Sequence, residues 1–221
     1  MTYMEFIEDY IKGIEYGNPI YTEDIVPEMA REYSLEDNKA AAAVSVAVKR
    51  IMDSESLPEL RKYQKGIYYR TKPTIFGDVE IDTGKLIDRK YISPDKGYET
   101  GAGLFYRMGL TTQIPAMRYI ATNVIRVGTR YDEKLEVTIC PPKTTVTAEN
   151  KRYLRVLDVL YQMDDIPYDA EHPYDIISGY VERCNLNYEM LLSYADMFYN
   201  QKTVIRLGHL AANKERRYVA S

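Results

Sequence analysis

The stretch Asp37–Lys72, DNKAAAAVSVAVKRIMDSESLPELRKYQKGIYYRTK, decides the fold expected for the N-terminal part of the chain. Its first half has the apolar period of a helix over residues 39–52. One side of this helix can be buried, and it carries Ala40, Val44, Ala47, Val48 and Ile51. The opposite side carries Lys39, Ala43, Val46, Lys49 and Arg50. Short alanine and valine side chains let a helix lie deep in a DNA major groove, so this opposite side is expected to meet bases and phosphates.

A short basic hairpin is expected after this helix. Two β-prone runs, residues 60–63 and 67–70, flank a turn of Gln64, Lys65 and Gly66. Every charged residue between positions 60 and 72 is basic, whereas the formal net charge of the whole chain is -4. A polyanion would therefore be attracted by a local patch and not by the net charge. The residues expected to contact DNA are Lys39, Lys49, Arg50, Arg61, Lys62, Lys65 and Arg70.

Two further helices are expected before this stretch. Apolar residues repeat at helical spacing over residues 3–16, and a Gly-Asn-Pro sequence ends that segment. A second helix is expected from a cap at Thr22 to about Tyr33, and Asp37 or Asn38 can cap the third helix. Helix, helix, turn, helix and basic hairpin is the order that a winged helix-turn-helix requires. The alternative is an alanine-rich core helix beside an ordinary surface hairpin.

The length of 221 residues is sufficient for two domains, each with its own core. The expected class is α+β, with a winged helix-turn-helix at residues 1–72 and a mixed, helix-rich α/β domain at residues 73–221. Residues 73–77 are expected to be a connection, and residues 135–140 alternate as a strand does. Helices are expected in the second domain near residues 80–92, 148–161, 174–183, 188–199 and 204–212.

Several broad classes of protein are not expected. No apolar run approaches the length of a membrane span, and the N-terminus lacks the features of a secretory signal, so we expect a cytoplasmic protein without membrane contact. The imidazoles of His172 and His209 lie in no catalytic motif. The acidic segment 164–175 is interpreted as a solvated linker, since a cation site needs converging oxygens. We expect a protein that is not an enzyme, with no cofactor and no metal site.

A glycine-containing stretch in the second domain carries a resemblance to a known family. Residues 97–115 read GYETGAGLFYRMGLTTQIP, and Ala-Thr-Asn follows at 121–123. The glycines lack GxGxxG spacing and no convincing strand precedes them, so a dinucleotide site is not expected. Together with the Gly-Ile-Tyr-Tyr sequence at 66–69, these strings resemble the signature of the AbiEi-type antitoxin family over roughly residues 20–160. The family-motif positions are Gly101, Gly109, Leu110, Thr111, Thr112, Gln113, Pro115 and Asn123.

The resemblance implies an antitoxin of a bacterial toxin-antitoxin or abortive-infection system. Such a protein is a transcriptional regulator that represses its own operon by binding double-stranded operator DNA at inverted repeats, and it opposes a nucleotidyltransferase-like toxin. Residues 165–221 match no motif of the family. Three other hypotheses remain open. The chain can be a protein-interaction module, or a transcriptional regulator without toxin antagonism, or it can be a nucleic-acid enzyme that uses Asp164 and Asp165.

Overall fold

The computed structural model describes residues 1–220, with side chains described for residues 1–213. The chain divides into two compact units, Met1–Leu86 and a second unit that begins at Ile87. Each unit combines helices with a small sheet, so the expected α+β class is confirmed. None of the helices in the described part of the chain has the length and apolar character that a membrane crossing needs.

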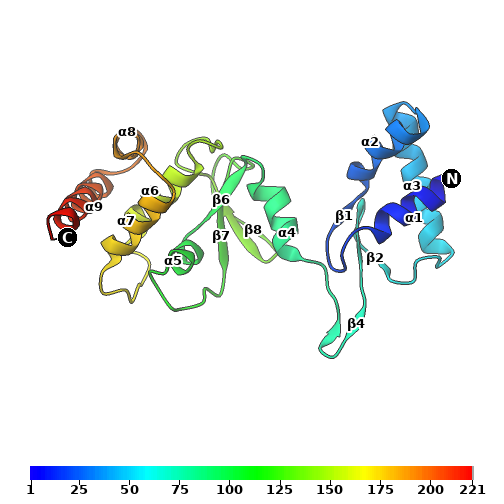
Figure 1. Cartoon of the computed structure of the whole chain (residues 1–221), viewed down its shortest axis with the longest axis horizontal. Helices are drawn as coiled ribbons and strands as arrows, with labels where there is room; N and C mark the ends of the chain where they lie inside the picture. The colour runs from blue at the N-terminus through cyan, green and yellow to red at the C-terminus, as the bar shows by residue number, and fades with distance from the viewer. Residues whose placement is uncertain (221) are drawn as a thin grey trace. The chain divides into compact units, whose positions relative to one another are not determined.

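The first unit contains three helices, a three-stranded antiparallel sheet (Figure 1) and, at its end, most of a fourth helix. Its elements are α1 (Tyr3–Lys12), β1 (Ile20–Tyr21), α2 (Thr22–Tyr33), α3 (Asp37–Asp53), β2 (Leu60–Gln64) and β3 (Ile67–Arg70). The strand order in the sheet is β1-β3-β2, so the short first strand pairs with the last. The helix expected at residues 39–52 and the hairpin expected at residues 60–70 are therefore confirmed.

One apolar core joins the helices of the first unit to its sheet. The five α3 positions expected to be buried are all buried: Ala40, Val44, Ala47, Val48 and Ile51. Four of them, Val44, Ala47, Val48 and Ile51, pack in one cluster with Ile7 of α1, Ile25 and Met29 of α2, and Leu60 of β2. Burial of a large aliphatic side chain contributes roughly 1.5–3 kcal/mol. This packing orients α3, because only its opposite side is left to face solvent.

The helix ends in the first unit differ from those expected. α1 ends at Lys12 and not near residue 16. Thr22 is the first residue of α2 and not its cap, and its hydroxyl donates to the carbonyl of Gly66 at 3.4 Å. α3 begins at Asp37 after Glu36, without a hydrogen bond from a capping side chain. The side chains expected to cap the helices make tertiary contacts or face solvent instead. A local sequence pattern does not show which of these a capping candidate will do.

A second hairpin follows the first, where the sequence pattern predicted only a connection. Its strands are β4 (Pro73–Thr74) and β5 (Gly77–Asp78), which form a separate antiparallel pair. The base of this hairpin is tied to the first unit, since Thr71 Oγ1 donates to the carbonyl of Val79 at 2.8 Å. The N–H of Asp82 donates to the carbonyl of Gly17 at 2.8 Å. These bonds explain why the first unit extends beyond the expected boundary at residue 72.

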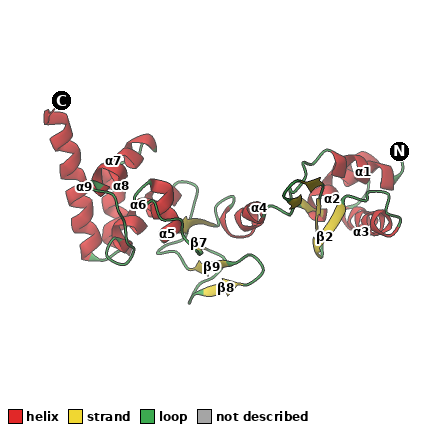
Figure 2. Ribbon diagram, turned by 90° about the horizontal axis from the view of Figure 1, so that it is seen from below, coloured by secondary structure: helices red, strands yellow, loops and turns green. Residues whose placement is uncertain are grey.

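The second unit has a four-stranded mixed sheet with the strand order β6-β7-β9-β8. The β7 and β9 pair is parallel, and the other pairs are antiparallel. Figure 2 shows α6 to α9 gathered on one side of this sheet. The elements from the boundary onward are α4 (Thr83–Ile87), the π-helical turn η1 (Asp88–Ile92), β6 (Gly97–Thr100), α5 (Ala102–Met108), β7 (Arg118–Thr122), β8 (Arg130–Asp132), β9 (Val137–Cys140), α6 (Lys151–Gln162), α7 (Pro173–Arg183), α8 (Tyr188–Phe198) and α9 (Gln201–Ala220).

The helices expected in this unit are all present, and the strand expected at residues 135–140 is β9. Strands β6, β7 and β8 were not expected. Strand β6 begins at Gly97, a residue type that weakens the signal of a strand. A Cβ atom at Gly97 would lie 2.3 Å from the carbonyl oxygen of Ala121 on β7, so only glycine fits there. The close approach of two strands, and not strand propensity, accounts for this residue.

A buried carboxylate ties the sheet of the second unit to its helices. Asp158 of α6 accepts hydrogen bonds from the hydroxyls of Tyr98 at 3.0 Å, Thr100 at 2.7 Å and Tyr199 at 2.7 Å. Loss of solvent raises the pKa of Asp158 above its ordinary value, and the three hydroxyl bonds act in the opposite direction. The same burial, together with the nearby carboxyl, raises the pKa of Tyr98. Asp158, Tyr98 and Thr100 are buried and Tyr199 is half-buried, so this cluster is a structural element of the fold.

Candidate nucleic-acid interface

The outward face of α3 is the first part of the candidate site. Its exposed side chains include Asn38, Lys39, Ala42, Ser45, Val46, Lys49, Arg50 and the carboxylate Asp53. Val46 has 50% of its surface exposed, an unusual position for a branched apolar residue. Ala43, which was expected on this face, is half-buried. Ala42 and Ser45 were not singled out from the sequence, although they precede Lys49 at helical spacing, which is the signal that would have identified them.

The cations of α3 lie at its two ends. Lys39 is in the first turn, where its ammonium is 3.1 Å from the carboxylate of Glu36 in an exposed ion pair. Such pairs contribute little to stability, so Lys39 can exchange its partner for a phosphate. Lys49 and Arg50 lie about 15 Å further along the helix axis, given a rise of about 1.5 Å per residue. Small and apolar side chains occupy the surface between these charged ends.

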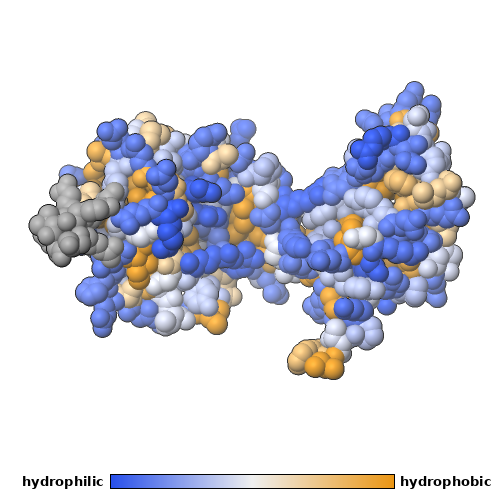
Figure 3. Space-filling view, in the orientation of Figure 1, coloured by the Kyte–Doolittle hydropathy of each residue, from blue (hydrophilic) through white to orange (hydrophobic). Residues whose placement is uncertain are grey.

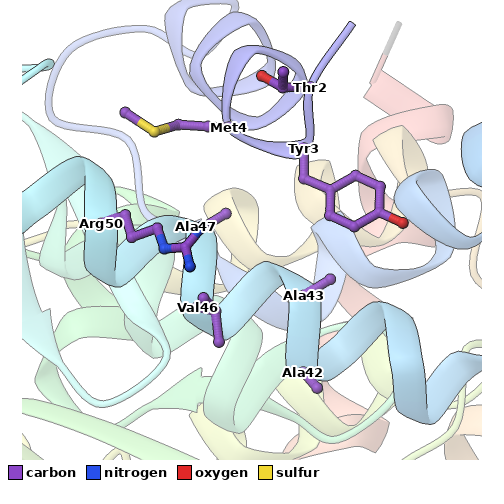
Figure 4. Close-up of a pocket in the computed structure, with 8 residues that line it drawn as sticks. All are labelled: Thr2, Tyr3, Met4, Ala42, Ala43, Val46, Ala47 and Arg50. Carbon is purple, nitrogen blue, oxygen red and sulfur yellow. The ribbon is translucent and has the colours of Figure 1, made fainter.

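A shallow groove runs between α3 and the start of α1 (Figure 4). It encloses about 490 Å³. Figure 4 shows Tyr3 and Met4 on the α1 side, and alanines, Val46 and Arg50 on the α3 side. The groove is therefore apolar along most of its length, and Arg50 supplies a positive charge at its margin.

The β2–β3 hairpin places three further cations at the surface. Arg61 is exposed, and its Nη1 donates to the carbonyls of Pro58 at 2.6 Å and Leu60 at 3.1 Å. Lys62 is exposed on β2, and Lys65 is exposed in the turn. These bonds hold the guanidinium of Arg61 against its own strand, whereas the two lysine side chains extend into solvent.

The turn of this hairpin is tied to α2. Gly66 has a positive φ of 79°, and a left-handed conformation of this kind favours glycine. Its carbonyl accepts the N–H of Thr22 at 2.9 Å. Lys65 is therefore held beside the start of α2, and the hairpin is short and fixed.

Arg70 does not lie on this surface, contrary to the expectation that it contacts DNA. Only 8% of its surface is exposed. Its guanidinium donates to the carbonyls of Lys12 at 2.8 Å and Ile14 at 2.9 Å, and to the hydroxyl of Tyr16 at 2.9 Å. It also lies 3.3 Å from the carboxylate of Glu59. Arg70 closes the C-terminal end of α1, so it is a structural residue and is withdrawn from the interface.

The register of the sheet explains the position of Arg70. Arg70 is directly opposite Leu60, whose side chain is buried, and directly opposed residues of an antiparallel pair share a face. Tyr68 stands two residues earlier on the same strand and also packs against the core. Counting the period of two from Tyr68 would have placed Arg70 on the inner face. The prediction that Arg70 contacts DNA grouped it with the neighbouring basic residues and did not apply the inward and outward alternation of a strand.

The family-motif positions belong to the second unit and build its backbone turns. Gly101 precedes α5 with φ 69°, and its N–H donates to Gln162 at 3.2 Å. Gly109 ends α5 in the left-handed conformation with φ 83°. Leu110 is fully buried, and its N–H donates to the carbonyl of Phe105 at 3.0 Å. A strand, β6, does precede Gly101, contrary to expectation, but the amide of Gly101 is already bonded within the protein.

The remaining motif positions fasten loops. Thr111 is buried, Gln113 is exposed and Pro115 is half-buried. The hydroxyl of Thr112 donates to Asp169 at 2.6 Å, and its N–H donates to the same carboxylate at 3.0 Å. Asn123 donates to the carbonyl of Val146 at 2.9 Å and accepts the N–H of Val146 at 2.9 Å. The structure thus gives these residues roles in shaping the second unit.

The acidic segment is engaged in ion pairs. Asp164 pairs with Lys202 and Arg206 of α9, and Asp169 holds Thr112. Within the described residues, histidine, cysteine, aspartate and glutamate side chains form no cluster of three or more that suits a metal ion. Asp165 is exposed beside this network. The acidic segment is therefore bonded to α9 through Asp164, and to the loop that carries Thr112 through Asp169.

Six of the seven cations expected at the interface are exposed on the first unit: Lys39, Lys49, Arg50, Arg61, Lys62 and Lys65. Cations suit phosphates, and the short side chains between those of α3 permit close approach to base edges. The sequence matches no protein-family model, and no curated protein shows significant similarity to it. The geometry of the first unit is therefore the main guide to function.

Proposed function

We propose that the first unit is a winged helix-turn-helix that binds double-stranded DNA through α3. The observation that carries this proposal is the exposed stripe of small residues on α3 with Lys49 and Arg50 at its end. The element order and the pairing of β1 with β3 support it, since a winged module has a helix pair followed by a hairpin. α3 enters the major groove, and Lys62 and Lys65 contact the neighbouring backbone.

We further propose that the chain is a bacterial antitoxin that acts in the cytoplasm and is not an enzyme. Its support is the resemblance of Gly109–Gln113 and Gly66–Tyr69 to the AbiEi-type signature. In this role the protein represses its own operon at inverted repeats and opposes a nucleotidyltransferase-like toxin. The DNA-binding part of the proposal stands on geometry, and the antitoxin part stands on these short motifs.

DNA binding is tested with a labelled duplex from the region upstream of the gene. Lys49→Ala/Arg50→Ala is expected to weaken binding by roughly 10- to 100-fold at constant salt, because contacts to bases and phosphates are lost. The matched control is Lys12→Ala/Lys85→Ala, which removes two exposed positive charges of the same unit that do not belong to α3. Binding that falls equally in both variants, or in neither, overturns the assignment of α3 to the major groove.

Antitoxin activity is tested by co-expression with the product of the neighbouring reading frame. Growth rescue by the wild-type chain supports the proposal, and its absence contradicts it. Lys62→Ala/Lys65→Ala separates the hypotheses that involve the hairpin. If this variant loses rescue but keeps operator binding, the basic hairpin contacts an acidic protein partner and not DNA.

A further inference from the structure

The tip of the β4–β5 hairpin carries two adjacent apolar side chains in full solvent. Ile75 has 92% of its surface exposed and Phe76 has 94%. Figure 3 shows this tip as an orange knob below the first unit. Scattered apolar residues are normal on protein surfaces, but two large neighbours with this exposure at a protruding turn indicate an interaction site.

Hydrogen bonds hold this tip in a defined shape. The hydroxyl of Thr74 donates to the carbonyl of Gly77 at 2.6 Å and accepts the N–H of Phe76 at 3.2 Å. At the base, the N–H of Val79 donates to the carbonyl of Lys72 at 3.0 Å. The hairpin therefore presents Ile75 and Phe76 outward, and the two side chains pack on nothing within their own unit.

The first unit also contains a hollow that suits such a knob. The groove between α1 and α3 is lined by apolar atoms of Tyr3, Met4, Ala43 and Val46, and it encloses about 490 Å³ (Figure 4). Half of the surface of Val46 is open to solvent there. The apolar tip and the apolar groove belong to the same folded unit and do not contact each other within it. The tip of one copy can therefore bury its side chains in the groove of a second copy.

The charges near the hairpin tip and near the α1–α3 groove also favour contact between two copies of the chain. Asp78 is exposed two residues after Phe76, and Glu80 is exposed beyond it. The exposed cation Lys72 lies at the base of the hairpin, where its ammonium is 4.9 Å from the ring centre of Tyr16. Arg50 lies at the margin of the groove. A tip flanked by carboxylates is repelled by a polyanion and attracted to Arg50. A second copy of this chain is therefore a better occupant than nucleic acid.

We propose that Ile75 and Phe76 of one chain dock in the α1–α3 groove of a second copy, with Asp78 facing Arg50. The contact is reciprocal, so two tips fill two grooves about a twofold axis. Val46 and Arg50 also belong to the face of α3 assigned to DNA. If that proposed function holds, self-association covers the DNA-binding face, and the two states exclude each other.

Sedimentation of the full chain over a concentration series, without DNA, tests the docking itself. We expect the wild-type chain to form dimers. The tip variant Ile75→Ser/Phe76→Ser and the groove variant Val46→Glu are each expected to raise the dimer dissociation constant by more than about tenfold, since burial of the tip drives association. The control Ile114→Ser changes an apolar residue of the second unit that is 79% exposed. This control is expected to leave the dimer dissociation constant unchanged.

Two complementation experiments show whether the tip meets this groove. A mixture of the tip variant and the groove variant retains one intact contact, so it is expected to form heterodimers although each variant alone is monomeric. Asp78→Arg and Arg50→Asp are each expected to weaken the dimer, and their combination is expected to restore it.

A monomeric wild-type chain at every concentration overturns the proposal, as does a tip variant that dimerises normally. A tip variant that loses DNA affinity while the wild-type chain stays monomeric reassigns the tip to DNA. Because sedimentation needs no operator, failure of the docking is distinguishable from failure of the DNA-binding proposal.

Discussion

The guanidinium carbon of Arg70 lies 4.2 Å from the ring centre of Tyr16, and its Nη1 donates to the carbonyls of Lys12, the last residue of α1, and of Ile14. We predict that Arg70→Met lowers the free energy of unfolding by about 3 kcal/mol, because buried hydrogen-bonding groups lose a charged donor. Urea denaturation measures this change. The exposed neighbour Lys62→Met is the control, with an expected change within about 0.5 kcal/mol. A stable R70M that has lost operator binding would return Arg70 to the interface.

The exposed cations predict the salt dependence of DNA binding. If Lys62 contacts a phosphate, Lys62→Ala lowers the slope of log K against log salt by about 0.9, and Lys65→Ala does the same. Arg70→Met is expected to leave the slope unchanged once stability is allowed for, because its guanidinium is buried. Fluorescence anisotropy titrations between about 50 and 200 mM salt measure the slopes. Equal slopes for all three variants would show that Lys62 and Lys65 of the hairpin do not contact phosphates.

The buried carboxyl of Asp158 predicts a pH-dependent stability. Burial raises its pKa above the ordinary 3.8, so the folded state binds this proton more tightly than the unfolded chain does. Its contribution to stability is complete below the unfolded-state pKa and is lost as pH rises through the folded-state pKa. Relative to the wild-type chain, Asp158→Asn is therefore expected to gain stability as pH rises from about 3.5 to 7.

Urea denaturation at each pH measures that difference, and Asp165→Asn is the matched control because it removes an exposed carboxylate. The difference for D165N is expected to change little with pH. A relative stability of D158N that falls as pH rises would show that the three hydroxyl bonds outweigh the cost of burying the charge.

The bond between Thr112 and Asp169 predicts that the backbone amide of Thr112 is protected from hydrogen exchange. Asp169→Ala removes the acceptor of the Thr112 N–H, so hydrogen exchange at this amide is expected to accelerate by roughly tenfold. The Thr112 bonds lower the pKa of Asp169, and this protection is therefore present above the ordinary pKa and lost as pH falls through the lowered value. Glu171→Ala is the nearby control. Unchanged exchange at Thr112 would show that the bond to Asp169 does not protect this amide.

Features set by neighbouring residues could be predicted from the sequence. The period of 3.6 over α3 and the Lys-Gly turn between β2 and β3 are local patterns, and both elements formed where they were expected. The β4–β5 hairpin escaped prediction because each of its strands has only two residues. Strand β6 escaped because Gly97 is required by the closeness of β7 and not by strand propensity.

The candidate site shows the same division. That Lys39 and Lys49 face solvent follows from helical period, and the exposure of Lys62 on β2 follows from polarity, since a charged side chain is costly to bury without a partner. Arg70 bonds the carbonyls of Lys12 and Ile14 at the end of α1, more than fifty residues earlier in the chain. Its burial could not be inferred from the basic run in which it stands.

Period, polarity and turn residues were thus sufficient for the α+β class, the helices and the exposed face of α3, because each depends on side chains within a few positions of one another. Folding in three dimensions decided that Asp158 meets Tyr98, that Thr112 meets Asp169, and that Ile75 and Phe76 stay exposed to solvent. Those relationships join distant segments whose approach is set by packing of the whole unit, and no local pattern records it.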